Sequence, residues 1–338
     1  MERAVAAAEP ARSWLVPLLA AEGPEAERLR RAADELRTRT MGDEVHLRAL
    51  IELSNYCRRN CMYCGLRLDH TGVRRYRLTP GEVLALAHQA EDLGYRTVVL
   101  QSGEDLYYET EVMAGMLRSI KAETDLAITL SLGERSDVTY AAWREAGADR
   151  YLLRIETTDP ALFAAMHPDG DLERRMRCLG QLKALGYQLG TGVLVGLPGQ
   201  TVVSTADDVI WMHELGAEMI GVGPFITHPD TPLAGANGGT LDQALNLLAT
   251  LRLVFPHAHL PATTALGALD PQGGEKGLEA GANVLMPNLT PETQREAYLL
   301  YPGKPIVDVT SATCRDRITE RVRAMGRTVA TDHGHVRR

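Results

Sequence analysis

Apolar residues fall in short runs that alternate with amphipathic stretches along the whole chain. Runs of roughly four to eight residues rich in Val, Ile and Leu are typical of buried β-strands. We predict eight strands, at 47–53, 96–101, 126–131, 150–155, 189–196, 219–223, 257–263 and 282–287. The amphipathic stretches between them end in EAGAD, ALGY, ELGA and EAGAN, where glycine indicates the end of a helix.

The clearest helix is predicted over TPGEVLALAHQAEDLG, residues 79–94. Thr79 suits the N-cap, Pro80 the first helical position, and Glu82 completes a capping box. Five apolar residues share one face of this helix: Val83, Leu86, Ala87, Ala90 and Leu93. Gly94 is a natural stop.

Strands that alternate with helices pair in parallel through right-handed crossovers. A doubly wound sheet would satisfy this rule, but eight units favour a (βα)8 TIM-type barrel, an α/β fold. We predict a helical extension over 1–45 and the barrel over 46–338, with a closing helix at RITERVRAMGR. In such a barrel the chemistry lies at the C-terminal ends of the strands.

Composition narrows the setting of this fold. The chain has 338 residues, of which 45% are apolar, and a net charge of −8. No apolar run approaches the ~18 residues of a membrane span, and the N-terminus lacks a secretion signal. We therefore expect a cytoplasmic protein with neither membrane nor nucleic acid as its main partner.

Three of the five cysteines crowd into CRRNCMYCG, residues 57–65, directly after the first predicted strand. Three thiolates this close indicate a metal centre in a reducing compartment. One alternative is structural zinc held by Cys57, Cys61, Cys64 and His70. Another is a four-iron cluster that keeps one iron free of protein ligands, open to a substrate. The remaining cysteines are distant: Cys178, expected in the core, and Cys314.

Charged residues mark the ends of later strands. QSGED brings Glu104 and Asp105, of which Asp105 also suits a turn or helix cap. Arg154 and Glu156 share one face of a strand, where they form either a buried ion pair or part of a functional site. An arginine early in the next helix could grip a carboxylate, and three candidates are available there: Arg174, Arg175 and Arg177. Polar groups also follow the last strands: His228, Thr263, Thr264, Tyr298 and Tyr301.

The C-x3-C-x2-C loop after the first strand, with an aromatic before its third cysteine, resembles the radical S-adenosylmethionine (SAM) superfamily. This resemblance implies one 4Fe-4S cluster on Cys57, Cys61 and Cys64, whose open iron binds SAM. Reductive cleavage of SAM then gives a 5'-deoxyadenosyl radical, with no catalytic residue beyond the cluster and SAM. The resemblance places Tyr63 beside the adenine, although loop packing would also explain it, and Gly103 and Glu104 near the SAM ammonium.

Further blocks, among them VLQSGED, VGLPGQT, GVGPFITHPDTPLA, PATTA and YPGK, resemble the FeFe-hydrogenase maturase family HydE from about residue 46 to 330. The family acts on a sulfur-containing organometallic iron precursor during H-cluster assembly, together with the maturases HydG and HydF. An electron donor such as a ferredoxin or flavodoxin is implied. The resemblance places SAM contacts at Ser131, Glu156 and Arg175. It places the substrate cavity at Arg154, Met219, Thr263, Thr264, Met286 and Tyr298.

Two departures from the family pattern bear on substrate and cofactor. Ile155 stands where many members have histidine, and a lone Cys314 predicts that no second cluster is present. The alternatives are another radical SAM enzyme, of the methylornithine synthase or biotin synthase kind, and a zinc-stabilised binding protein.

Overall fold

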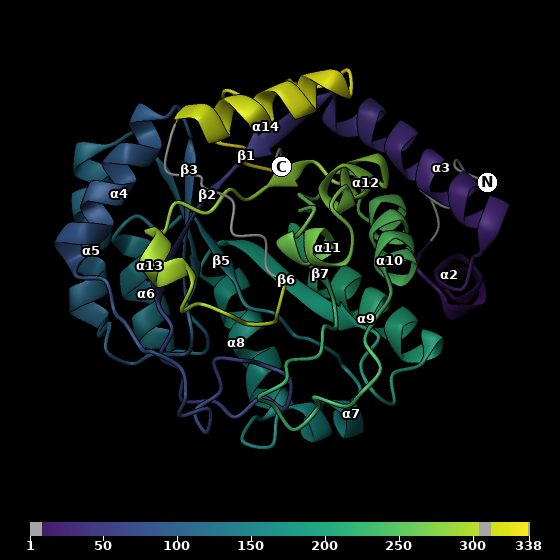
Figure 1. Cartoon of the computed structure of the whole chain (residues 1–338), viewed down its shortest axis with the longest axis horizontal. Coiled ribbons are helices and arrows are strands. Elements are labelled where there is room, and N and C mark those ends of the chain that lie inside the picture. Colours follow the sequence, from purple (N-terminus) through teal and green to yellow (C-terminus); the bar gives the residue numbers. More distant parts are fainter. Residues whose placement is uncertain (1–8, 304–311, 337–338) are drawn as a thin grey trace.

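The computed structural model describes residues 9–303 and 312–336, with side chains from residue 315 onward in the second segment. Strands occupy the centre and helices surround them (Figure 1). Within the described part, no helix is long and apolar enough to cross a bilayer.

Six parallel strands follow one another around the sheet in sequence order. They are β2 (Ala49–Ser54), β3 (Thr97–Ser102), β4 (Ala127–Ser131), β5 (Arg150–Leu152), β6 (Gln188–Val195) and β7 (Met219–Pro224). Parallel bridges continue the ring from Met219 to His259 and from Pro261 to Val284 in β8 (Val284–Leu285). A last bridge joins Asn288 back to Leu50 of β2. The ring closes, which confirms the predicted barrel and excludes an open, doubly wound sheet.

Three strand predictions were too long. The stretch 282–287 keeps only the two residues of β8. The stretch 257–263 forms only the single bridges at His259 and Pro261. Proline lacks the N–H that a central strand needs, and a helix begins at Thr264. The prediction over 150–155 also overshoots, because β5 ends at Leu152 and the backbone turns sharply at Glu156.

The helices that cover the barrel match the predicted alternation. They are α4 (Pro80–Asp92), α5 (Thr110–Glu123), α6 (Asp137–Glu145), α7 (Pro160–Met166), α8 (Leu172–Ala184), α9 (Val202–Leu215), α10 (Leu241–Val254), α11 (Thr264–Leu269), α12 (Gly273–Glu279) and α13 (Glu292–Arg295). The capping box of α4 forms as expected: the Thr79 hydroxyl accepts from the Glu82 N–H, and the Glu82 carboxylate from the Thr79 N–H. Gly94 follows the helix with a φ of 78°.

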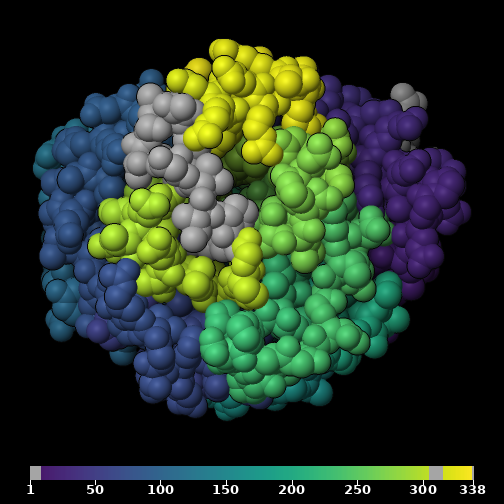
Figure 2. Space-filling view, viewed as in Figure 1, coloured from purple at the N-terminus to yellow at the C-terminus, as the bar shows by residue number. Residues whose placement is uncertain are grey.

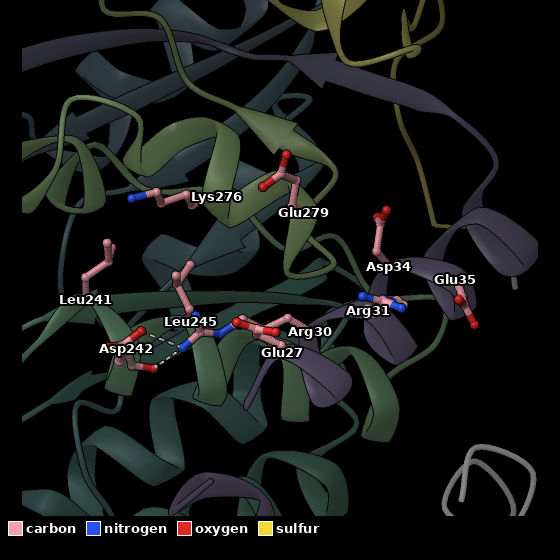
Figure 3. A pocket seen from close by; sticks show the side chains of 10 residues that line it. All are labelled: Glu27, Arg30, Arg31, Asp34, Glu35, Leu241, Asp242, Leu245, Lys276 and Glu279. Atoms are coloured by element: carbon pink, nitrogen blue, oxygen red, sulfur yellow. Dashed lines mark hydrogen bonds and ion pairs between the residues drawn. The ribbon is translucent and has the colours of Figure 1, made fainter. Parts of the chain in front are cut away.

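The N-terminal helices lie outside the barrel. Helices α2 (Arg12–Leu19) and α3 (Gly23–Met41) pack against α9 and α10. Arg30 of α3 reaches Asp242 of α10 at 2.7 Å, in a charged groove of about 610 Å³ between α3, α10 and α12 (Figure 3). The domain boundary at residue 45 stays a prediction.

The last strand and the residues after it lie at the end of the barrel opposite the cysteine loop, and the helix before them packs beside α12. The predicted closing helix is α14 (Ala312–Ala324), and β9 (Thr328–Val329), which was not predicted, pairs with β1 (Glu44–Leu47). Strand β1 also pairs with β8. The C-terminal ends of the strands are left to the loops, as a TIM-type active site requires.

Candidate functional site

The cysteine loop leaves the C-terminal end of β2 and is held by backbone hydrogen bonds from three directions. Arg58 N–H donates to the Glu104 carbonyl at 3.1 Å, Met62 N–H to Met166 at 2.9 Å, and Gly65 N–H to Leu300 at 3.0 Å. All three cysteines of the loop are partly exposed and none forms a disulfide. The fold therefore fixes the loop but leaves its thiols free.

Each of the three cysteine sulfurs has its own hydrogen-bond partner, and none of these partners is another cysteine. The Glu104 N–H donates to Cys57 Sγ at 3.3 Å, and the Leu66 N–H to Cys64 Sγ at 3.4 Å. His167 Nδ1 lies 3.3 Å from Cys61 Sγ. Cysteine ligands of iron–sulfur clusters accept such hydrogen bonds, which influence the reduction potential. This donor set fits a bound cluster.

Burial raises the pKa of all three thiols, and that of Cys64 to about 12. A thiolate in this position therefore needs a cation, and metal ligation supplies one. A single zinc ion would require sulfurs about 3.8 Å apart. The described residues contain no group of three or more His, Cys, Asp or Glu side chains that could hold one metal ion. A cluster differs, because its ligands bind separate iron atoms.

His70, the fourth ligand of the zinc alternative, does not face the sulfurs. Its Nδ1 lies 2.7 Å from the Gly65 carbonyl oxygen, and its Nε2 lies 3.7 Å from Asp230. The structure therefore favours the cluster over a Cys3His zinc site.

A network of charged side chains, centred on the buried carboxylates of Glu134 and Glu104, supports the cysteine loop. Glu134 contacts Arg175 at 2.6 Å, Arg59 at 3.0 Å and Arg174 at 3.1 Å. Glu104 pairs with Arg58 at 2.5 Å and with Arg59 at 2.9 Å. Four guanidinium groups thus meet two carboxylates, which leaves an excess of positive charge beside the cysteines. That excess suits anionic sulfur ligands and a substrate carboxylate.

Gly103 and Glu104 both help to hold the cysteine loop, in addition to the SAM contacts that the resemblance implies. A Cβ on Gly103 would lie 2.2 Å from the Tyr56 carbonyl oxygen, so glycine allows the loop after β3 to approach the cysteine loop. The Glu104 carboxylate is bound to Arg58 and Arg59, which outweigh burial and lower its pKa. This carboxylate therefore helps to hold the cysteine loop, and its contact with the SAM ammonium stays a prediction. Asp105 likewise binds Arg77 at 2.7 Å.

Arg154 and Glu156 form the anticipated ion pair at 3.1 Å, with both side chains partly buried. Burial raises the Glu156 pKa against the opposing charges of Arg154 and Arg175. Glu156 has a φ of 67°, the one positive value among the described non-glycine residues. Such backbone strain persists where the surroundings enforce it, often at functional sites.

The three candidate arginines of α8 differ in burial. Arg175 is buried, donates from Nη1 to the Arg154 carbonyl at 2.7 Å and contacts Glu134. The Arg174 and Arg177 side chains are 49% and 67% exposed. Arg175 is therefore the most buried of the three, and its contact with SAM stays a prediction.

Two further predicted contacts lie close by. Tyr63 lies edge-on to His167, with ring centroids 5.6 Å apart, and packs beside a small apolar cluster that includes Leu194 and Phe225. Ser131 ends β4 and pairs with Gln101 of β3. Tyr63 therefore packs against its neighbours beside the cysteines. Loop packing is one of the two roles that the sequence left open for it, and the contact with adenine stays a prediction.

The predicted substrate residues divide into two groups. Thr263, Thr264 and Met286 line a cavity of about 600 Å³, which opens between α14 and the α11–α12 region (Figure 2). Arg154, Met219 and Tyr298 lie inside the barrel and are not part of its lining. Met219 Sδ accepts from Arg48 Nη1 at 3.1 Å, and the Tyr298 hydroxyl accepts from Gln101 Nε2 at 3.2 Å.

Two residues at this site were not found from the sequence. Glu134 ends the stretch SLGE, residues 131–134, at the end of a predicted strand. Its role was not predicted because its three arginine partners come from distant segments. His167 follows α7 without any motif, 106 residues from Cys61 along the chain. Neither contact leaves a local signal.

A TIM-type barrel that presents three free cysteines at the C-terminal end of its first barrel strand defines a radical SAM enzyme. Residues 51–212 match the family model "Radical SAM superfamily". A solved methylornithine synthase (PylB) superposes with a TM-score of 0.84 over 97% of this chain and 96% of that one, at 26% identity.

The sequence relatives narrow this class. The chain is 47% identical to the [FeFe] hydrogenase maturase subunit HydE of Thermotoga maritima, over 91% of this chain and 88% of the relative. It is 31% identical to 3-methylornithine synthase of Methanosarcina barkeri, over 84% and 81%. The chain belongs to the HydE family of radical SAM enzymes.

Proposed function

We propose that this enzyme acts on a sulfur-containing organometallic iron compound in the assembly of the FeFe-hydrogenase H-cluster. The observation that supports this proposal is the cysteine loop, with a hydrogen-bond partner at each sulfur, in a chain 47% identical to HydE. When bound, the cluster and SAM supply one-electron reductive cleavage of SAM and thereby a 5'-deoxyadenosyl radical.

The protein side chains would bind and orient these groups. Cys57, Cys61 and Cys64 would hold a single 4Fe-4S cluster, and the network around Glu134 keeps their loop in place. We propose Arg175 for the SAM carboxylate, because it is buried beside the loop and, with Nε bound to Glu134 and Nη1 to the Arg154 carbonyl, it can still offer Nη2. The remaining SAM contacts stay as predicted: Tyr63, Gly103 through its backbone, Glu104, Ser131 and Glu156.

Glu104 stays a proposed contact of the SAM ammonium, and it also supports the cysteine loop. Its carboxylate neutralises Arg58 and Arg59 and its N–H faces Cys57 Sγ. The strained Glu156 is the better candidate for a direct contact, since burial among few partners makes its charge costly without a ligand.

The substrate would enter the barrel beneath the cysteine loop. We propose that Arg154, Met219 and Tyr298 contact it inside, and that Thr263, Thr264 and Met286 line its route. A separate observation supports each group. Arg154, Met219 and Tyr298 lie within the barrel, and the other three residues line the cavity of about 600 Å³.

The partners that we propose are the maturases HydG and HydF and an acidic electron carrier such as a ferredoxin or flavodoxin. Residues 57–77 contain six arginines and one aspartate, a net charge of +5, and the paired carboxylates of Glu104, Asp105 and Glu134 reduce it to +2. Because the whole chain carries −8, the other residues together carry −13. A basic segment beside the cluster would attract an acidic carrier to the place where the electron is needed.

Cysteine replacement tests the proposed site. Cys57→Ala, Cys61→Ala or Cys64→Ala should abolish formation of 5'-deoxyadenosine after anaerobic reconstitution with iron and sulfide. Cys178→Ala is the matched control, because that thiol is buried on α8 and should leave the reaction intact. Retained product in any loop variant would exclude its ligand role.

In-vitro maturation tests the substrate. Apo-hydrogenase supplied with the other maturases should gain activity only when this protein is added. If maturation does not respond while lysine is converted to methylornithine, the enzyme is instead of the methylornithine synthase kind, the alternative that the 31% identical relative favours.

A further inference from the structure

His167 is held rigidly against the cysteine loop. Its side chain is only 3% exposed, and its ring packs on Phe163 with centroids 4.5 Å apart. The segment around it docks on the loop: Met166 O accepts from Met62 N–H, and Asp169 Oδ2 accepts from Asn60 N–H at 3.0 Å. Gly170 completes the packing, since a Cβ there would lie 2.9 Å from His167 Cβ.

Both ring nitrogens of His167 face polar partners. Nδ1 lies 3.3 Å from Cys61 Sγ, and Nε2 lies 3.5 Å from the Tyr63 hydroxyl. A thiolate can only accept hydrogen bonds, so a ligating Cys61 selects the tautomer that carries its proton on Nδ1. Nε2 then accepts from Tyr63. A directed chain results, from the Tyr63 hydroxyl through the imidazole to the sulfur.

We propose that His167 is a positioning residue that raises the reduction potential of the cluster by donating a hydrogen bond to Cys61. The proposal rests on the proposed function, because it requires a cluster on this cysteine. An N–H dipole aimed at a sulfur ligand stabilises the more negative, reduced state. Cys57 and Cys64 receive backbone N–H groups, so Cys61 is the ligand whose hydrogen bond a side-chain substitution can remove.

The test measures the midpoint potential of the reconstituted cluster by electron paramagnetic resonance titration, without SAM or substrate. His167→Phe keeps an aromatic ring on Phe163 but removes the N–H, and His167→Gln supplies an amide donor instead. We expect His167→Phe to lower the reduced-to-oxidised ratio about tenfold at fixed potential, a shift of about 59 mV for one electron. His167→Gln should recover part of it.

His88→Gln is the matched control, because His88 lies on the outer surface of α4 beside Glu123 and should not change the potential. Equal potentials in wild type, His167→Phe and His167→Gln would overturn the proposal. An equal shift of the midpoint potential in both His167 variants would also overturn the proposal, since the hydrogen-bond donor would then have no effect.

A second measurement tests the proposal in the case that His167→Phe does not bind iron. Wild-type protein labelled with ¹⁵N-histidine should show a histidine nitrogen coupled to the reduced cluster, and His167→Gln should lose that coupling. Its absence in the wild type overturns the inference. Wild-type iron loading is scored separately: a loaded cluster without coupling refutes this inference alone, whereas failure to bind iron refutes the proposed function as well.

Discussion

At the scale of the single residue, Glu156 combines two costs that a purely structural residue would avoid. A left-handed backbone at a non-glycine residue costs on the order of 1–3 kcal/mol. Burial of its carboxylate opposes ionisation, as the raised pKa shows. Thr191 and Gly192 of β6 hold the backbone beside it: Ile155 N–H donates to the Thr191 hydroxyl, and Glu156 N–H to the Gly192 carbonyl.

We predict that Glu156→Ala weakens SAM binding. Loss of a hydrogen bond to a charged group costs about 1.5–3 kcal/mol, which corresponds to roughly 10- to 150-fold in Kd. Equilibrium dialysis of SAM against the reconstituted variant would measure this. Glu156→Gly should bind SAM as weakly as Glu156→Ala but unfold at a higher temperature, because glycine relieves the strain. Unchanged affinity in both variants would reduce Glu156 to a partner of Arg154.

Gly103 supports a second prediction at this scale. In Gly103→Ala the new methyl group would lie 2.2 Å from Tyr56 O and 2.8 Å from Cys57 Cβ, so the cysteine loop must shift. We expect iron bound per chain after reconstitution to fall by more than half, with little change in far-ultraviolet circular dichroism. Gly180→Ala, on the exposed side of α8 with no atom within 4 Å, should bind iron normally and gain about 0.5–1 kcal/mol. Normal iron content in Gly103→Ala would show that the loop tolerates the shift.

At the scale of the element, α9 holds the segment that follows Glu156. Asp208 of α9 is fully buried, and its Oδ1 accepts from Thr158 N–H at 2.5 Å and from the Thr158 hydroxyl at 2.7 Å. Burial raises its pKa to about 7, even though these hydrogen bonds favour the charged form. Oδ2 has no hydrogen-bond partner in the described structure. The Thr157 hydroxyl is a third donor to Oδ1, at 3.4 Å, and an amide at this position would keep these three accepting contacts without the charge.

We therefore predict a pH-dependent effect of Asp208→Asn on stability. The folded-state pKa lies above the usual 3.8, so the contribution of Asp208 is fully present below pH 3.8 and declines until the pH passes 7. Between pH 5 and pH 8 the wild type should lose about 2–3 kcal/mol from this group, and the variant none. Anaerobic denaturant unfolding of both proteins at these two pH values measures it. A stability difference that is the same at both values would contradict the raised pKa.

Elements built from local patterns could be predicted, and those that depend on distant partners could not. The capping box allowed α4 to be predicted, and the apolar runs allowed the central strands to be located. Residues 257–263 have a similar apolar character, but the proline at 261 and the helix that starts at 264 reduce them to two bridges. The cysteines were found from spacing alone. The ion pairs of Glu104 and the contact of His167 were missed because their partners, Arg59 and Cys61, are 45 and 106 residues away.

At the scale of the whole molecule, the two ends of the barrel are built differently. The cysteine loop, the charge network and Glu156 gather where the strands end. At the opposite end, Arg150 donates to the His333 carbonyl at 2.6 Å and Arg48 to that of Gly334 at 3.3 Å, so the last described residues cover the bottom. The proposed site therefore lies at the end of the barrel that these tail residues leave uncovered.

The cluster count is a property of the whole chain and decides between one redox centre and two. Within the described residues the free cysteines are the three of the loop and the buried Cys178, and the side chain of Cys314 lies outside them. We predict four iron and four sulfide per chain after anaerobic reconstitution, since only the loop offers three sulfurs to one cluster. Colorimetric iron and sulfide assays would measure this, with Cys314→Ala as the matched variant. About eight iron per chain, falling to four in Cys314→Ala, would establish a second cluster and a different path for electrons to the first.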